Sequence, residues 1–170
     1  MRKTLLFIAM MGIVSFTFAQ DIFNAARTNN KAEIEKYIAA GIRVDTTNSR
    51  GFTPLILAIY NDSFEAASYL IEKGANVNAQ DMSGNTALMG ATFKAFPRMV
   101  DLLLNANANV NQKNLNEATA LIFAATFGQQ EIAKKLLTKG ADKSIKDKTG
   151  KTALDHATLQ ENAAMIDLLK

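Results

Sequence analysis

The sequence predicts an all-α repeat solenoid, in which helix–turn–helix units stack on one another and are joined by loops that resemble β-hairpins. The first observation is that residues of several chemical types recur at one fixed interval along the chain, the interval that separates Thr53 from Thr86. Threonine, leucine and alanine each recur at this spacing: Thr53, Thr86, Thr119 and Thr152; Leu55, Leu88, Leu121 and Leu154; Ala58, Ala91, Ala124 and Ala157. A fixed period of this size indicates a stacked array, because each unit buries its apolar face only against its neighbours.

The second observation is the pattern inside one unit, residues 49–80. Residues 55–59 have the apolar spacing of a helix, and a short polar break follows. A second helical run extends from Phe64 to Lys73 and is followed by Gly74. Glycine is preferred where a helix ends in the left-handed conformation. Each unit is therefore predicted to be helix, turn, helix, and then an extended arm that leads into the next unit.

The two ends of this unit carry a recognisable signature, Thr53-Pro54-Leu55-Ile56 at its start and Gly74-Ala75-Asn76-Val77-Asn78 at its end. These residues resemble the ankyrin repeat family, whose repeats begin Thr-Pro-Leu-His and end Gly-Ala-Asp-Val-Asn or similar. Less complete copies follow at Thr86-Ala87-Leu88-Met89, Asn107-Ala108-Asn109-Val110-Asn111, Thr119-Ala120-Leu121-Ile122, Gly140-Ala141-Asp142 and Thr152-Ala153-Leu154-Asp155. The resemblance covers about residues 21–170. It implies the fold and a role in binding another protein, but it does not identify the partner.

The repeats are predicted to lie at about 21–48, 49–80, 81–113, 114–146 and 147–170, within a single domain of residues 20–170. The first and last are expected to be polar caps, because a terminal repeat has one face without a neighbour. Helices are expected at 22–29 and 32–40 in the first repeat, which ends at Gly41.

Three residues depart from the repeat pattern. Pro97 is expected to open a second helix, where proline is tolerated in the first turn. Asn107 replaces a capping glycine and is the next best residue for a left-handed backbone. Glu117 stands where the other repeats have glycine, so the tip of its loop is expected to differ in shape. The family's usual histidine is also replaced, by Ile56, Met89, Ile122 and Asp155.

Residues 1–19 predict a cleaved secretory signal peptide. Arg2 and Lys3 precede an apolar run over residues 5–18, and small residues precede a cut expected between Ala19 and Gln20. The alternative is a membrane anchor, but the run is shorter than the roughly 20 apolar residues that span a bilayer. We therefore expect an exported protein, periplasmic or secreted, with no membrane insertion after cleavage. The absence of cysteine favours a bacterial periplasm, because secreted eukaryotic domains more often carry disulfides.

The charge balance excludes an obvious polyanion binder. The chain has a net charge of +3, but loss of Arg2 and Lys3 would leave 17 basic and 16 acidic residues. We therefore expect no nucleic-acid partner. One local excess remains, formed by Lys134, Lys135, Lys139, Lys143, Lys146, Lys148 and Lys151. Ordinary solvation of a terminal repeat explains it, and an anionic partner is the alternative.

The residues for catalysis and metal binding are sparse. There is no cysteine, and His156 is the only histidine. His156 is expected to be a satisfied residue within the repeat packing and not a general base. No cluster of metal-ligating residues and no glycine-rich phosphate loop is present in the sequence. We therefore expect no enzymatic activity, no cofactor and no metal.

The surface expected to bind a partner consists of the loop tips and the exposed ends of the first helices, as the resemblance implies. Several of these positions carry large apolar side chains, which are typical of interaction hot spots. The predicted partner-binding residues are Arg50, Phe52, Tyr60, Asn61, Met82, Asn85, Phe93, Lys94, Leu115, Asn116 and Phe127. In the alternative interpretation, Tyr60, Phe93 and Phe127 stack on one another and only fill the concave wall.

The predicted function is therefore that of a non-enzymatic protein–protein interaction module of the cell envelope, which acts as a monomer on a partner that the residues do not identify. A structural or assembly protein that self-associates through the same surface is the second hypothesis. An enzyme is the third and the least supported.

Overall fold

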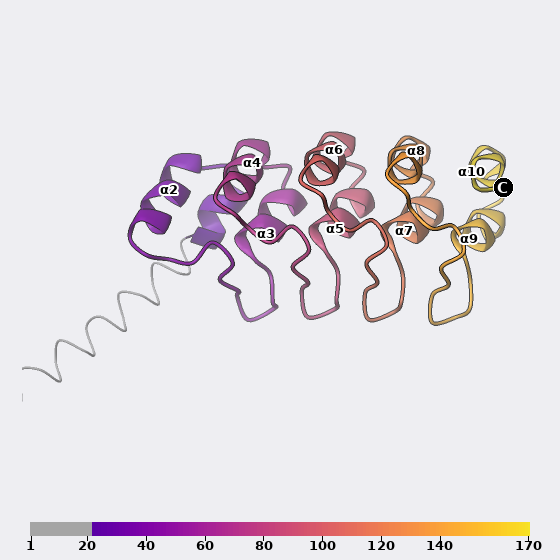
Figure 1. Ribbon diagram of the computed structural model, residues 1–170, viewed down its shortest axis with the longest axis horizontal. Coiled ribbons are helices and arrows are strands. Elements are labelled where there is room, and N and C mark those ends of the chain that lie inside the picture. The colour runs from indigo at the N-terminus through magenta and orange to yellow at the C-terminus, as the bar shows by residue number, and fades with distance from the viewer. Residues whose placement is uncertain (1–21) are drawn as a thin grey trace, which may run out of the picture. The chain divides into compact units, whose positions relative to one another are not determined.

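The computed structural model describes residues 22–170 and shows helical hairpins separated by extended loops (Figure 1). The chain divides into two compact units, one up to Ala75 and one from Asn76 to Lys170. Each unit is a stack of helical hairpins, as the predicted all-α repeat architecture requires. The predicted signal peptide at 1–19 and its cut between Ala19 and Gln20 lie outside the described residues.

The first unit contains helical residues 22–27 and then α2 (Lys31–Ala39), α3 (Pro54–Tyr60) and α4 (Phe64–Glu72). The two helices expected at 22–29 and 32–40 are thus present; the first ends at residue 27, and the second begins and ends one residue earlier than expected. Helix α2 packs against α4. Neighbouring hairpins are also joined by hydrogen bonds. The Ser63 hydroxyl donates to the Arg27 carbonyl at 2.9 Å, and the Ala66 amide donates to the Asn29 side chain at 2.9 Å.

The second unit contains three hairpins, formed by α5 (Ala87–Phe93) with α6 (Pro97–Asn105), α7 (Ala120–Thr126) with α8 (Gln130–Thr138), and α9 (Ala153–Leu159) with α10 (Ala163–Leu169). The first helices form one row, in which α7 contacts both α5 and α9. The second helices form another row, in which α8 contacts both α6 and α10 (Figure 1). The core lies between the two rows.

The recurring threonines explain where the first helices begin. In α3, α5, α7 and α9 the residue before the helix is a threonine whose hydroxyl accepts a hydrogen bond from the amide three residues later. Such N-caps satisfy an amide that has no partner within the helix. Most of the recurring leucines and all of the recurring alanines that follow are buried in the core. The residues that recur with the repeat period are therefore helix caps and buried side chains.

Two of the predicted departures are confirmed. Pro97 is the first residue of α6, where its missing amide hydrogen costs nothing. Asn107 has φ 60° and follows α6 in the same left-handed conformation that Gly74 and Gly140 adopt after their helices, at φ 85°. Both substitutions thus preserve the backbone of the repeat.

The expectation that Glu117 changes the shape of its loop tip is wrong. Glu117 has φ 57° and keeps the left-handed conformation of Gly84 and Gly150, which have φ 74° and 77°. Its amide donates to the Asn114 carbonyl at 2.9 Å, and the Gly84 and Gly150 amides make the same bond at the same distance in their tips. The hydrogen bonds of the tip hold its shape, so the glutamate adopts a strained backbone.

Candidate functional site

Each loop tip is built around an asparagine or aspartate that recurs with the repeat period, at Asn48, Asp81, Asn114 and Asp147. In each tip the side-chain oxygen accepts hydrogen bonds from the backbone amides two and four residues later, at 2.8–3.1 Å. This pairing closes the turn locally. The tips therefore have the same frame, and they differ in the side chains that the frame exposes.

Hydrogen bonds also join successive tips of the second unit. The Leu115 amide donates to the Ser83 carbonyl, and the Lys148 amide donates to the Asn116 carbonyl, both at 3.0 Å. The Asn114 side chain donates to the Asn85 side chain at 2.8 Å. Asn85, predicted as a partner-binding residue, therefore also helps to hold two tips together.

The predicted binding residues of the first unit are Arg50, Phe52, Tyr60 and Asn61. Arg50 and Asn61 are exposed, whereas Phe52 and Tyr60 are half-buried. The two rings contact each other, with centroids 6.0 Å apart and planes tilted by 57°. The structure thus brings the tip residue Phe52 together with the end of α3, and each ring covers part of the other.

The second unit exposes a larger apolar surface. Met82 and Leu115 at the tips are 71% and 61% exposed, and Phe93 and Phe127 at the ends of α5 and α7 are each 47% exposed. Lys94 and Asn116, the remaining predicted residues, are also exposed.

The aromatic rings of this surface are in contact. The Phe93 and Phe127 rings meet edge to face, with centroids 5.1 Å apart and an angle of 81°. Phe127 also contacts Phe123, at 6.1 Å. The alternative in which aromatic residues stack on one another thus describes Phe93 and Phe127, yet each residue keeps about half of its surface in solvent.

Beside Phe127 lies a pocket with a volume of about 460 Å³. Its apolar part comes from α7 and the residues next to it, and its polar part comes from two loop tips and α9. The lining residues are Asn114, Asn116, Ala118, Ile122, Phe123, Thr126, Phe127, Asp147, Lys148, Thr149 and His156. Among the predicted partner-binding residues, Asn116 and Phe127 belong to this pocket.

A small side chain on α7 leaves room for the pocket. Thr126 lies at the position that Tyr60, Phe93 and Leu159 occupy in the second, third and fifth repeats. Its hydroxyl donates to the Ile122 carbonyl of the preceding helical turn at 2.8 Å. A threonine in place of an aromatic or leucine side chain removes volume at the end of α7, next to Phe123 and Phe127.

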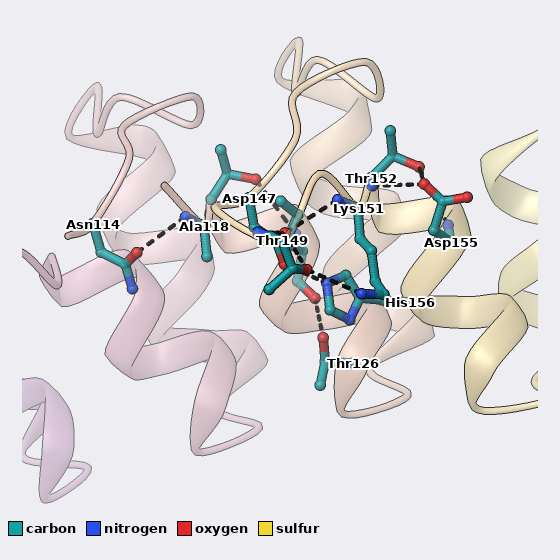
Figure 2. Close-up of polar contacts among 11 residues, drawn as sticks. Asn114, Ala118, Thr126, Asp147, Thr149, Lys151, Thr152, Asp155 and His156 are labelled. Atoms are coloured by element: carbon teal, nitrogen blue, oxygen red, sulfur yellow. Dashed lines mark hydrogen bonds and ion pairs between the residues drawn. The ribbon is translucent and has the colours of Figure 1, made fainter. Parts of the chain in front are cut away.

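Asp147 and His156 form the polar wall of the pocket (Figure 2). His156 Nε2 and Asp147 Oδ2 are 2.7 Å apart, and their side chains are 19% and 10% exposed. Asp147 Oδ1 accepts from the Thr149 hydroxyl at 2.7 Å and from the Thr149 and Lys151 amides at 2.8 and 3.1 Å. Burial raises the pKa of the Asp147 carboxyl, but these hydrogen bonds outweigh burial and hold that pKa well below its usual value.

The prediction that His156 is a satisfied residue is confirmed by its contact with Asp147. Its place in the wall of a pocket was missed, as were those of Phe123 and Asp147. The repeat period could have identified Asp147 as the frame residue of its tip. No pattern in the sequence shows that the His156 ring, further along the chain on α9, turns back to that frame.

The tip that covers the pocket is basic. Lys143, Lys146, Lys148 and Lys151 follow one another closely in the sequence, and none of them takes part in an ion pair within residues 22–170. The Lys151 ammonium donates to the Thr149 hydroxyl at 3.2 Å, which leaves its charge uncompensated.

The carboxylates near these lysines are engaged by other groups. Hydrogen bonds from the Ser144 hydroxyl and amide lower the pKa of Asp142, and bonds from the Thr152 amide and hydroxyl lower the pKa of Asp155. These anions thus accept bonds from backbone amides and hydroxyls, and the charge of Lys146 also helps to lower the pKa of Asp155. Lys143, Lys146 and Lys148 are exposed to solvent.

Within the described part of the chain, no three His, Cys, Asp or Glu side chains come together in a way that could hold a metal ion. Over the same residues, every helix is too short or too polar to cross a bilayer.

The family model described as ankyrin repeats, in three copies, matches residues 22–114 and 95–170. The two matches together cover all the residues that the structure describes. No curated protein matches the chain significantly.

Proposed function

Because the chain belongs to the ankyrin repeat family, whose members are generally protein–protein interaction modules, we propose that it is a non-enzymatic module that binds a partner protein. The binding surface consists of the loop tips and the exposed ends of the first helices. The observation that carries the proposal is the exposure of four apolar side chains in the second unit, Met82, Phe93, Leu115 and Phe127. Their burial by a partner would remove a large apolar area from water.

The geometry around His156 supports a binding role over a catalytic one. In a nucleophilic triad, a carboxylate orients one nitrogen of the histidine ring and the nucleophile is hydrogen-bonded to the other. Asp147 contacts Nε2, but in residues 22–170 no serine or threonine hydroxyl is hydrogen-bonded to the ring. The nearby Thr149 hydroxyl donates to Asp147 and the Thr126 hydroxyl donates to a backbone carbonyl. The pair therefore stabilises the tip.

The test is a capture experiment from a cell-envelope extract, with the full chain as bait. A variant bait carries Met82→Ala, Phe93→Ala and Leu115→Ala, which remove apolar surface without replacing any residue that lines the pocket. Truncating hot-spot residues costs about 2 kcal/mol or more each, which is roughly 30-fold in affinity. We expect a protein that the parent bait retains and the variant loses.

The control bait carries alanine at Asn105, Lys134 and Lys139, which are exposed in the same unit on or next to the second helices. It should retain the partner. Failure of the parent bait to retain any protein, or equal retention by all three baits, would contradict the proposed surface.

Self-association through the same surface is the second candidate, and the exposed Phe93–Phe127 pair is the observation that favours it. Measuring the mass of the chain over a range of concentrations separates the two. A monomer at all concentrations is expected for the binding module, whereas a reversible dimer that Phe93→Ala dissociates would establish self-association.

We also propose that the chain is exported through the signal peptide at residues 1–19 and acts in the periplasm or outside the cell. Amino-terminal sequencing of the purified protein should then begin at Gln20. A protein that retains Met1 and fractionates with the cytoplasm would refute this.

A further inference from the structure

We propose that the pocket beside Phe127 binds an acidic segment of the partner protein and takes up one apolar, preferably aromatic, side chain from that segment. This inference rests on the proposed function and names the chemistry of the partner at one part of its surface.

The pocket has room for a large apolar side chain. Its volume of about 460 Å³ lies within the range of roughly 300–1,000 Å³ that is typical of ligand sites. Ile122, Phe123 and Phe127 supply apolar walls, and Ala118 and Thr126 are the small residues that leave the space open. Aromatic rings that meet at an angle or with an offset stabilise each other beyond the area they bury. A ring that enters the pocket would meet two phenylalanines.

The charges around the pocket favour an acidic segment. Lys148 lies in the lining and Lys151 belongs to the same tip, and neither lysine takes part in an ion pair within the described range. Positive charges that remain uncompensated attract carboxylates and raise the rate of encounter with an acidic partner.

Asp147 is the one anion in the lining, and its carboxylate is already occupied. Its two oxygens accept from Thr149, from the Lys151 amide and from His156. These donors compensate its charge, so it opposes an acidic ligand less than a free carboxylate would.

A polypeptide is favoured over a small molecule because the pocket continues into the exposed apolar surface. Phe127 forms part of the pocket and its ring also contacts Phe93, which lies outside the lining. Leu115, 61% exposed, lies next to the lining residues Asn114 and Asn116. A ligand that fills the pocket can therefore extend over neighbouring apolar side chains, as a chain of several residues does.

The test uses a short fluorescein-labelled peptide with one phenylalanine flanked by glutamates, titrated with the full chain and followed by fluorescence anisotropy. One comparison peptide has alanine in place of the phenylalanine, and another has lysines in place of the glutamates. We expect weak binding of the first peptide, with a Kd on the order of 0.1–1 mM, and at least about tenfold weaker binding of the other two.

Variants of the chain locate the binding. Thr126→Phe and Thr126→Leu restore the large side chains of Phe93 and Leu159 at the equivalent position, so the fold should tolerate them. Both should weaken peptide binding at least about tenfold, and Thr126→Ser should not. Lys148→Gln should weaken binding about two- to fivefold and reduce its dependence on salt, whereas Lys134→Gln on α8 should have no effect.

The proposal is overturned if the acidic phenylalanine peptide fails to bind at millimolar concentration, if the lysine peptide binds as well, or if both large Thr126 variants bind like the parent. Circular dichroism of the Thr126 variants must match that of the parent for this comparison. A partner captured through Met82, Phe93 and Leu115 would still support the proposed function in any of these cases, so the two failures are distinguishable.

Discussion

Replacing Glu117 by glycine should stabilise the second unit, because the residue adopts a backbone that an L-amino acid disfavours. Its φ of 57° is in the left-handed region, where the equivalent positions have Gly51, Gly84 and Gly150. A side chain in this conformation costs about 1–2 kcal/mol, since the β-carbon lies too close to the carbonyl oxygen. Glycine has no β-carbon and removes that cost.

Two smaller effects oppose the gain. Glycine makes the unfolded chain more flexible, which costs about 0.4–1 kcal/mol of stability. The substitution also removes the ion pair between Lys113 Nζ and Glu117 Oε2, which are 3.5 Å apart. Both side chains are about half exposed, so that pair contributes only about 0–0.5 kcal/mol. The net expectation for Glu117→Gly is a stabilisation of about 0.5–1 kcal/mol.

Urea unfolding of the full chain, followed by far-ultraviolet circular dichroism, measures the difference. With an m-value of about 1–3 kcal/mol/M, the midpoint should rise by roughly 0.3 M. Glu117→Ala is the matched control, because it removes the same ion pair and retains the β-carbon. Its midpoint should be unchanged or lower. If alanine raises the midpoint as much as glycine, or if glycine lowers it, the strain argument is wrong.

Two further predictions concern the same tips. A β-carbon on Gly84 would lie 2.7 Å from the Leu115 amide nitrogen, whereas one on Gly150 would have no neighbour within 4 Å. Gly150→Ala should therefore cost about 1 kcal/mol through its positive φ, and Gly84→Ala at least about 1 kcal/mol more; equal losses in urea unfolding would refute the close approach. Asp147 has a lowered pKa in the folded chain, so its contribution to stability is complete above about pH 4 and is lost as the pH falls below that value. Asp147→Asn retains a side chain that Asn48 and Asn114 use at the same position, and it should make the unfolding free energy depend less steeply on pH below about 4. An unchanged slope in acid titrations of stability would contradict this.

The sequence predicts most of the fold because the residues that recur with the repeat period each have a local structural role. Each threonine that opens a first helix caps it, and the leucines that recur in α3, α5 and α7 are buried in the core. Asn107 could be assigned correctly because a single property, tolerance of a left-handed backbone, decides its role. Helix ends were less well placed, and the helix expected over 22–29 ends at residue 27.

The prediction at Glu117 failed because it considered one residue and not the bonds around it. The frame residue Asn114 closes the turn, and backbone bonds from Leu115 to Ser83 and from Lys148 to Asn116 join the tip to its two neighbours. Together they stabilise the shared turn by more than the strain of one glutamate costs. The glutamate at this position therefore strains its own backbone and does not change the shape of the tip.

The pocket could not be predicted from the sequence, because it depends on how side chains from different repeats meet. The small size of Thr126 is visible when the repeats are compared with one another, but that position alone does not show whether a neighbour fills the space. Phe127 contacts Phe93 and Phe123. His156 contacts Asp147 on the other side of the pocket. These contacts are properties of the packed chain.

The positions that keep the period and those that break it have different roles in this chain. The threonine caps and the Asn or Asp residues of the tips recur because every repeat needs them to close its turns. Ser49, Met82, Leu115 and Lys148 follow those frame residues at the same interval and are all exposed, and they include polar, apolar and charged side chains. Since the frame is maintained by backbone bonds and buried side chains, these exposed positions can change at little cost to folding. The residues that select a partner are therefore expected at positions that do not follow the repeat pattern. Thr126 is such a position, and it lines the pocket beside the basic tip.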